Sequence, residues 1–161
     1  ELATAYNTVY VNGTVGQKLT NGLITDTLHW SEGNETREKK VRALVKNNYY
    51  AFDCSGMVKA LLLWQWEGDF YKYNGNEEVN QAGLLDLCTE KGDVTDCDMI
   101  LPGEFLYKDG HCGIYIGNGE VIHAANTNAG VIKTPIGDSG WTHWLKIPYV
   151  TYAEETEEST E

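Results

Sequence analysis

The pattern of apolar and polar positions changes about two thirds of the way along the 161-residue chain. Before residue 101, apolar residues recur mainly at the three- and four-residue spacing of a helix, and after it they fall in short alternating runs. The first kind of pattern predicts helices over residues 19–30 and 35–47. The second of these would carry an apolar stripe formed by Val41, Leu44 and Val45.

One further helix is predicted to be buried on all sides. Residues 57–66 contain only Lys59 and Gln65 as polar positions, and a helix that is apolar all round is normally a buried one. Asp53 is a favourable N-cap for this helix, and Gly68 suits its end. We therefore expect the central helix of the fold here.

The second part of the chain is predicted to form a sheet. Residues 69–100 are polar, with one short helix predicted around 78–88, and we expect them to lie over one side of the core. Turn signals then separate β-prone runs, which predict strands at 104–107, 111–116, 120–124, 131–134 and 145–150. Helices followed by hairpin-connected strands indicate an α+β domain with an antiparallel sheet.

The start of the buried helix carries a cysteine in a setting that favours its anionic form. Cys54 follows the predicted N-cap, where unpaired backbone N–H groups and the helix dipole stabilise a negative charge. The thiolate is the nucleophilic form of cysteine. A lone buried cysteine is usually inert packing, so a catalytic role for Cys54 requires a base close by.

Two histidines in a predicted hairpin can supply that base. A two-residue turn at 118–119 would point His111 and His123 to opposite faces of the sheet. A three-residue turn at 117–119 would place Gly113 opposite His123 and bring His111 diagonal to it on the same face. We expect the three-residue turn, because it ends on a glycine and makes the other face of the hairpin uniformly apolar, with Ile114, Ile116 and Ile122 on it.

This register assigns a role to each group. Cys54 would be the nucleophile, His111 the base that takes its proton, and His123 the third group that orients and polarises His111. Backbone N–H groups of Cys54 and Ser55 at the helix start would hold the oxyanion. The predicted chemistry is acyl transfer through a Cys–His–His triad.

The remaining cysteines and histidines are weaker candidates for a catalytic role. Strand alternation points Cys112 away from His111, which makes it a poorer nucleophile, and His143 is a spare candidate for the third triad position. Cys88 and Cys97 either close a small disulfide loop or remain two free thiols. No C-x₂-C pair is present, so we expect no metal site.

The net charge and the length of the apolar runs argue against two classes of protein. A net charge of −12 without a Lys/Arg cluster argues against nucleic-acid binding, and no apolar run approaches the roughly 18 residues of a membrane span. We expect one catalytic domain over residues 1–152 and a flexible acidic tail or linker over 153–161. Because the chain starts at Glu1 without Met, we expect a processed product or an excised domain.

Taken together, these motifs resemble the NlpC/P60 family of cell-wall cysteine peptidases. The resemblance is carried, in order, by the residues 52–56, 101–104, 111–119 and 121–124. It implies a papain-like fold in which the Cys54 helix packs on a sheet bearing His111 and His123, and an enzyme that needs no metal or cofactor. Glu104 departs from the usual Asp of the family's Pro-Gly-Asp turn, and Cys112 from the usual apolar residue.

The resemblance also implies a substrate and a place. The substrate would be the stem peptide of peptidoglycan, commonly cut after γ-linked D-glutamate, and the enzyme would be extracellular or in the cell wall, secreted or delivered by a phage or mobile element. It implies a monomeric catalytic domain, in a chain that can carry further domains. The family's tyrosine near the nucleophile is assigned to Tyr50, with Asp53 and Ser55 in supporting positions.

Two alternatives remain open at this stage. The same triad could serve an amidase that cuts between muramic acid and L-alanine, and the fold could also be a catalytically silent cell-wall-binding domain. An intact Cys54, His111 and His123 argue against the silent domain. Four tryptophans could stack on sugars, although packing is the more common role for such residues; these are Trp64, Trp66, Trp141 and Trp144.

Overall fold

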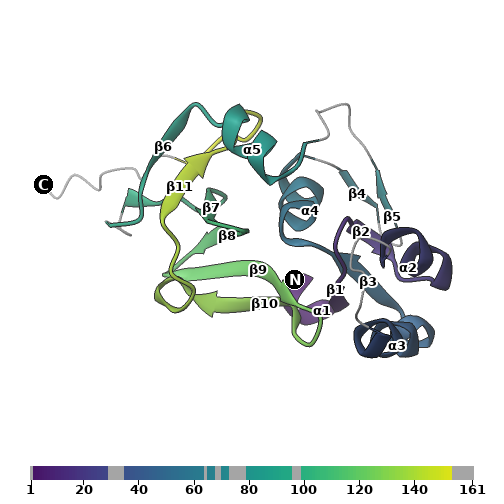
Figure 1. Ribbon diagram of the computed structural model, residues 1–161. Coiled ribbons are helices and arrows are strands. Elements are labelled where there is room, and N and C mark those ends of the chain that lie inside the picture. The colour runs from purple at the N-terminus through teal and green to yellow at the C-terminus, as the bar shows by residue number, and fades with distance from the viewer. Residues whose placement is uncertain are drawn as a thin grey trace, which may run out of the picture.

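The computed structural model confirms an α+β fold with an antiparallel sheet. It describes residues 2–28, 35–63, 65–67, 70–72, 79–95 and 99–153. Figure 1 shows the larger sheet on one side of the molecule, a smaller sheet with α2 and α3 on the other, and α4 between them. Among the described residues, no helix has the length and apolar character needed to cross a bilayer.

The larger sheet has six antiparallel strands in the order β10-β9-β8-β7-β11-β6. Their bounds are β6 Glu90–Asp93, β7 Phe105–Lys108, β8 His111–Gly117, β9 Glu120–Asn126, β10 Gly130–Pro135 and β11 His143–Lys146. Strand β11 begins and ends earlier than the expected 145–150. The polar β6 was not expected at all, and it pairs only at the edge of the sheet, where burial is not required.

The smaller sheet contains three strands in the order β1-β3-β2. Its elements are β1 Asn7–Tyr10, β2 Val15–Lys18 and β3 Tyr49–Phe52, accompanied by α1 Leu2–Ala5, α2 Asn21–Leu28, α3 Glu35–Leu44 and a 3₁₀ turn Val45–Asn47. The predicted stripe is confirmed, since Val41 is buried and Leu44 and Val45 pack against the same cluster. This small unit therefore has an apolar core of its own.

The central helix is shorter than its sequence predicts. Helix α4 spans Cys54–Val58 and continues as one wide π-helical turn over Lys59–Leu63. The chain then becomes extended, because β4 Gln65–Glu67 pairs with β5 Phe70–Lys72 and so satisfies its backbone outside the helix. The expectation of a helix to residue 66 is wrong. The expected end at Gly68 lies outside the described residues.

Helix α4 is buried mainly through its first two turns. Met57, Val58 and Ala60 are almost fully buried, in a cluster shared with β8, β9 and β3. Leu61 in the following turn is 37% exposed, so burial on all sides does not extend along the predicted length. The short helix α5, Gln81–Leu87, covers this core and contributes the buried Leu84.

The turn between β8 and β9 differs from the expected one. Gly117 pairs with Glu120 across the two-residue turn Asn118-Gly119, so the predicted three-residue turn is wrong. Both turn residues have positive φ, 54° for Asn118 and 72° for Gly119. This is the two-residue geometry that matches the twist of paired strands, and an Asn-Gly sequence favours it.

A bulge restores the predicted register beyond that turn. The pairing shifts between Tyr115 and Gly117, and from there Tyr115 pairs with Val121. The bulge leaves Ile116 38% exposed instead of on the predicted apolar face. The register around the two histidines is thus the predicted one, although it arises from a tight turn plus one extra residue.

Candidate active site

The start of α4 is held by the side chain of Asp53. Its Oδ1 accepts a hydrogen bond from the Gly56 backbone N–H at 2.6 Å, as the predicted N-cap requires, and its Oδ2 accepts one from Gly13 N–H at 2.7 Å. Burial raises the pKa of this carboxyl. A Cβ on Gly56 would lie 1.9 Å from the carbonyl oxygen of Thr14, so only glycine permits this approach. The helix start is therefore joined closely to the N-terminal segment.

The Cys54 thiol is strongly acidic. A hydrogen bond from Cys112 is the largest influence on its pKa; a hydrogen bond and the charge of His111, with the Ser55 N–H, add to it. Together they outweigh burial and lower the pKa of Cys54 to about 4. The thiolate is thus the favoured form at neutral pH, mainly through Cys112 and His111, and the Ser55 N–H is the contribution that comes from the helix start.

Cys112 contacts the nucleophile, although strand alternation alone predicts that it points away from the site. It lies on the Ile114 face of the sheet, as predicted, but α4 packs on that same face and carries Cys54 with it. Its hydrogen bond to Cys54, together with burial, raises the pKa of Cys112 well above the usual value. Cys112 therefore remains a neutral S–H donor to the thiolate.

His111 and His123 lie together on the other face, as the predicted register requires. His111 Nε2 and His123 Nδ1 are 2.8 Å apart, and His123 Nε2 lies 3.1 Å from Thr134 Oγ1 on β10. A Cβ on Gly113 would lie 3.1 Å from the Cβ of His123 and 2.9 Å from the carbonyl oxygen of Ile122. The glycine between the two histidine positions makes room for their diagonal contact.

Burial determines the protonation of the histidine pair. Burial lowers the pKa of His123 to about 4, with further contributions from the charges of His111 and Lys108. His123 is therefore neutral near pH 7. The arrangement in which His111 Nε2–H donates to His123 Nδ1 and His123 Nε2–H donates to Thr134 satisfies each ring nitrogen. It leaves His111 Nδ1 to face Cys54.

Trp141 packs against both histidines. Its ring is stacked on His111, with centroids 5.4 Å apart and an interplanar angle of 18°, and lies edge-on to His123. The side chain is buried, so its role is packing and not the sugar stacking considered above. Lys108 Nζ lies 5.7 Å from the centroid of the same ring. Trp141 thus shields the histidine pair from solvent.

The tyrosine at the thiol is Tyr10, at the end of β1. Its hydroxyl hydrogen-bonds the Cys54 side chain and accepts from the Cys54 N–H, and burial, then the negative charges of Cys54 and Asp53, raise the pKa of Tyr10. Tyr50, the residue suggested by sequence proximity, packs edge-on against Tyr6 with centroids 5.6 Å apart. Proximity along the chain could not indicate Tyr10, because β1 lies parallel to β3 and delivers it from 44 residues upstream.

The thiol opens onto a cleft of about 340 Å³. Its lining is drawn from four parts of the chain and consists of Tyr10, Asn12, Gly13, Asp53, Cys54, Ser55, Asn80, Gln81 and Gly110. Gln81 on α5 donates to the carbonyl oxygen of His111 at 3.0 Å, which fixes the start of β8 at the edge of the cleft. No sequence signal marked Gln81 or Thr134, because each acts through one tertiary contact.

The other candidates lie elsewhere. His143 is partly exposed and pairs with Asp93 at 3.3 Å, so His123 and not His143 adjoins His111. Cys88 is a free buried thiol whose pKa burial raises to about 11, and Cys97 lies outside the described residues. Trp144 packs over Gly92. The side chains of the remaining candidates for sugar stacking lie outside the described residues: Trp64 and Trp66.

Comparison with known proteins gives one family. Two solved structures are similar, NlpC1 from Trichomonas vaginalis with 18% identity and a TM-score of 0.45, and NlpC2 from the same organism with 21% and 0.37. They are matched over 92% and 65% of this chain, which spans 41% and 38% of theirs. No curated protein matches the chain. The NlpC/P60 family model matches residues 32–149, so the chain belongs to the NlpC/P60 family, whose members are generally cell-wall cysteine peptidases.

Proposed function

We propose that this chain is a cysteine endopeptidase that hydrolyses a stem-peptide bond of peptidoglycan, at the carbonyl of γ-linked D-glutamate. The observation that carries the proposal is the hydrogen-bonded series from Cys54 through His111 to His123 and Thr134, with a thiol pKa of about 4. An acidic thiol beside an oriented imidazole is what acyl transfer near neutral pH requires.

The first half of the reaction forms a thioester. The Cys54 thiolate attacks the scissile carbonyl carbon, and the carbonyl oxygen takes up the negative charge. The Tyr10 hydroxyl hydrogen-bonds the sulfur and would turn to donate to that oxyanion, which would also free the Cys54 N–H, now bonded to the Tyr10 oxygen, as a second donor. His111, protonated at Nδ1, then gives its proton to the departing amine, and the C–N bond breaks.

The second half releases the acid. Neutral His111 takes a proton from a water molecule, which attacks the thioester and frees the Cys54 thiolate. Throughout, His123 acts as a positioning residue that accepts from His111 Nε2 and stays neutral, because burial lowers its pKa to about 4. Its hydrogen bond to Thr134 fixes the tautomer that can accept.

The place of action follows from the substrate. Peptidoglycan lies outside the membrane, so we propose an extracellular or cell-wall protein. Secretion or delivery by a phage or mobile element would bring it there.

The test is digestion of synthetic muropeptides followed by mass spectrometry. A new amine on the residue after D-glutamate is the expected product, and Cys54→Ala should abolish it. A new amine on L-alanine would instead assign the chain as an amidase. If Cys54→Ala cleaves as fast as the unaltered chain, the peptidase proposal fails altogether.

A further inference from the structure

Cys112 places a second thiol against the nucleophile. It is fully buried on β8, on the face of the sheet that α4 covers, and its S–H donates a hydrogen bond to the Cys54 sulfur. An apolar side chain would fill such a position without a polar group that needs a partner. The fold therefore brings together two sulfurs that are 58 residues apart in the chain.

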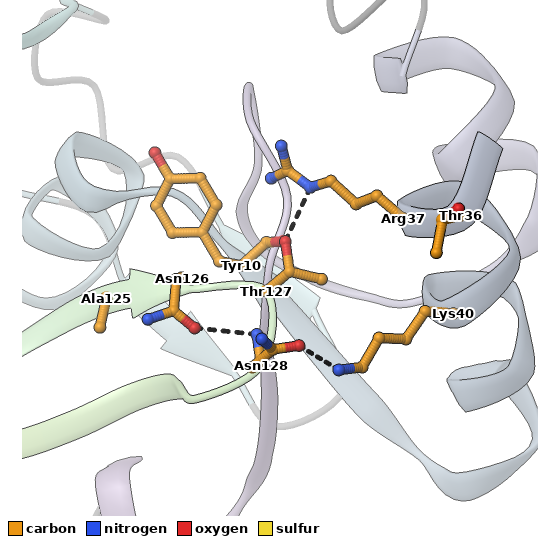
Figure 2. Close-up of a pocket in the computed structure, with 8 residues that line it drawn as sticks. All are labelled: Tyr10, Thr36, Arg37, Lys40, Ala125, Asn126, Thr127 and Asn128. Carbon is orange, nitrogen blue, oxygen red and sulfur yellow. Dashed lines mark hydrogen bonds between the residues drawn. The ribbon is translucent and has the colours of Figure 1, made fainter. Parts of the chain in front are cut away.

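The surroundings of the Cys54 sulfur give Cys112 a distinct place. The sulfur is in hydrogen-bond contact with the side chains of Tyr10, His111 and Cys112. Figure 2 shows the Tyr10 hydroxyl pointing away from Arg37, whose guanidinium lies 5.9 Å from the centroid of the Tyr10 ring. Of the groups at the sulfur, Cys112 is the one that can join an oxidised Cys54 in a disulfide.

An oxidant reaches the two sulfurs unequally. Cys54 lines the cleft of about 340 Å³, which has room for a peroxide molecule, whereas Cys112 is fully buried and does not line it. The thiolate is the form that reacts with peroxides, and a pKa of about 4 keeps Cys54 anionic at neutral pH. Burial raises the pKa of Cys88 to about 11, so this thiol stays protonated. Among the cysteines that the structure describes, Cys54 is therefore the one that a peroxide oxidises first.

We propose that Cys54 and Cys112 form a redox switch, in which hydrogen peroxide joins the two sulfurs in a disulfide that thiol reductants reopen. The inference rests on the proposed function for its claim that the disulfide stops peptide cleavage, because the same sulfur is the proposed nucleophile. Formation of the bond itself depends only on the two thiols. Such a switch suits an enzyme proposed to act outside the cell, where disulfides persist.

The disulfide forms in two steps. The Cys54 thiolate attacks one peroxide oxygen and the O–O bond breaks, which leaves a sulfenic acid on Cys54; the departing hydroxide takes the proton of His111 and becomes water. The Cys112 sulfur then attacks the Cys54 sulfur, the S–S bond forms and the S–O bond breaks, and the Cys112 proton leaves with the oxygen as a second water. The peroxide is thus reduced to two waters while the two sulfurs are oxidised.

The charge on Cys54 sets the order of these steps. The hydrogen bond to Cys54, burial and the negative charge of Cys54 raise the pKa of Cys112, so Cys112 stays an S–H donor while the nucleophile is a thiolate. Conversion of the thiolate to a sulfenic acid removes that charge, which makes Cys112 easier to deprotonate when it has to attack. Without Cys112, the sulfenic acid would react further to a sulfinic acid, which thiol reductants do not reverse.

The experiment treats the 161-residue chain with hydrogen peroxide at neutral pH, blocks free thiols with iodoacetamide and maps the digested peptides by mass spectrometry without reductant. We expect a pair of peptides joined through Cys54 and Cys112, which dithiothreitol separates. The test variant is Cys112→Ser, which keeps a hydrogen-bond donor beside Cys54 but cannot form a disulfide. In this variant Cys54 should end as a sulfinic acid.

Muropeptide cleavage gives a second readout, as the fraction of each chain's own starting rate that dithiothreitol restores after oxidation. This fraction should be roughly tenfold or more higher in the unaltered chain than in Cys112→Ser, because a sulfinic acid resists thiol reductants. Cys88→Ser is the matched control at another buried cysteine and should behave like the unaltered chain. Thermal melts check that each variant is folded, and Cys112→Ala replaces Cys112→Ser if the latter is not.

Three results would overturn the switch. The first is oxidation of Cys54 in the unaltered chain to a sulfinic acid, or to a disulfide with Cys88 or Cys97, without a bond to Cys112. The second is equal recovery of the unaltered chain and Cys112→Ser. The third is a cross-linked chain that cleaves at its starting rate, which would also remove Cys54 as the nucleophile. If the chain cleaves no muropeptide before oxidation, the proposed function fails, and the cross-link found by mass mapping decides whether the two sulfurs form the disulfide.

Discussion

The two halves of the candidate active site are built in different ways. His111, His123 and Thr134 stand on three adjacent strands and inherit their spacing from the ladder of the sheet. Tyr10 instead lies at the end of β1 in the smaller sheet, and Cys54 follows β3 of that sheet at the start of α4. Side-chain hydrogen bonds of Asp53 add to this pairing. Positions within one sheet change only in steps of whole residues, whereas the contact between two separate sheets can shift by fractions of an ångström. The histidine half therefore sets the chemistry, and its contact with the other half is where substrate fit can vary.

The largest loss of activity is expected from variants of the histidine half of the site. His111→Ala removes the proton acceptor and should lower kcat by roughly 10²–10⁴. His123→Ala should lower it less, because His111 remains but loses its orientation. Muropeptide cleavage rates measure both effects. His143→Ala is the control, since that residue pairs with Asp93 away from the site; a loss equal to that of His123→Ala would contradict the assigned third position.

The second largest effect tests the half of the site that contains Tyr10 and Cys54. Tyr10→Phe deletes the hydroxyl at the thiol and keeps the ring beneath Arg37. Removal of an oxyanion donor should lower kcat by about a hundredfold with little change in KM. Tyr50→Phe is the matched control. If Tyr50→Phe has the larger effect on kcat, the original assignment to Tyr50 is the correct one.

A smaller loss of stability and activity is expected when a methyl group is added between the two histidine positions. Gly113→Ala places a methyl 3.1 Å from the Cβ of His123 and 2.9 Å from a backbone carbonyl oxygen. The free energy of unfolding should fall by about 1–3 kcal/mol in a denaturant titration, and kcat should fall with it. Gly137→Ala, which meets no atom within 4 Å, should leave both unchanged. Equal behaviour of the two variants would show that Gly113 does not make room for the histidine pair.

The smallest effect is expected from removal of Cys112, whose S–H donates to the Cys54 thiolate. Cys112→Ala removes the largest influence that lowers the pKa of Cys54, so this pKa should rise from about 4 by about one to two units. Alkylation of Cys54 by iodoacetamide, followed by peptide mass mapping, reports the thiolate fraction. In the unaltered chain the rate should fall as the pH drops through about 4, and in the variant it should fall at higher pH. Cys88→Ala should not move the midpoint.

The parts of the fold that followed from the sequence are those governed by local pattern. The Asp53 cap, the cysteine at the helix start and the strands around His111 and His123 depend on neighbours along the chain. The register was right for the histidines although the turn was wrong. Two compensating irregularities, a tight Asn-Gly turn and a bulge, cannot be separated from one longer turn by alternation alone.

The parts that did not follow are those made by contacts between distant segments. Tyr10 reaches the thiol because β1 and β3 pair in parallel. Turn residues in the sequence predict hairpins between neighbouring strands, but they do not predict a parallel pairing of this kind. Cys112 meets Cys54 because α4 covers one face of the sheet while the histidines occupy the other. The extension of the chain after Leu63 follows from pairing between β4 and β5, which overrides the apolar helical pattern. Each depends on tertiary packing that a single sequence does not specify.

The bulge at Ile116 also restricts how this hairpin can change over evolution. Side chains alternate between faces, so loss of that one residue from β8, or gain of a second, would turn His111 away from His123 while leaving both strands paired. Insertions or deletions in this stretch should survive only when they preserve parity. The interval between the two histidines is therefore expected to change in relatives by even numbers, or to carry a compensating bulge wherever it changes by one.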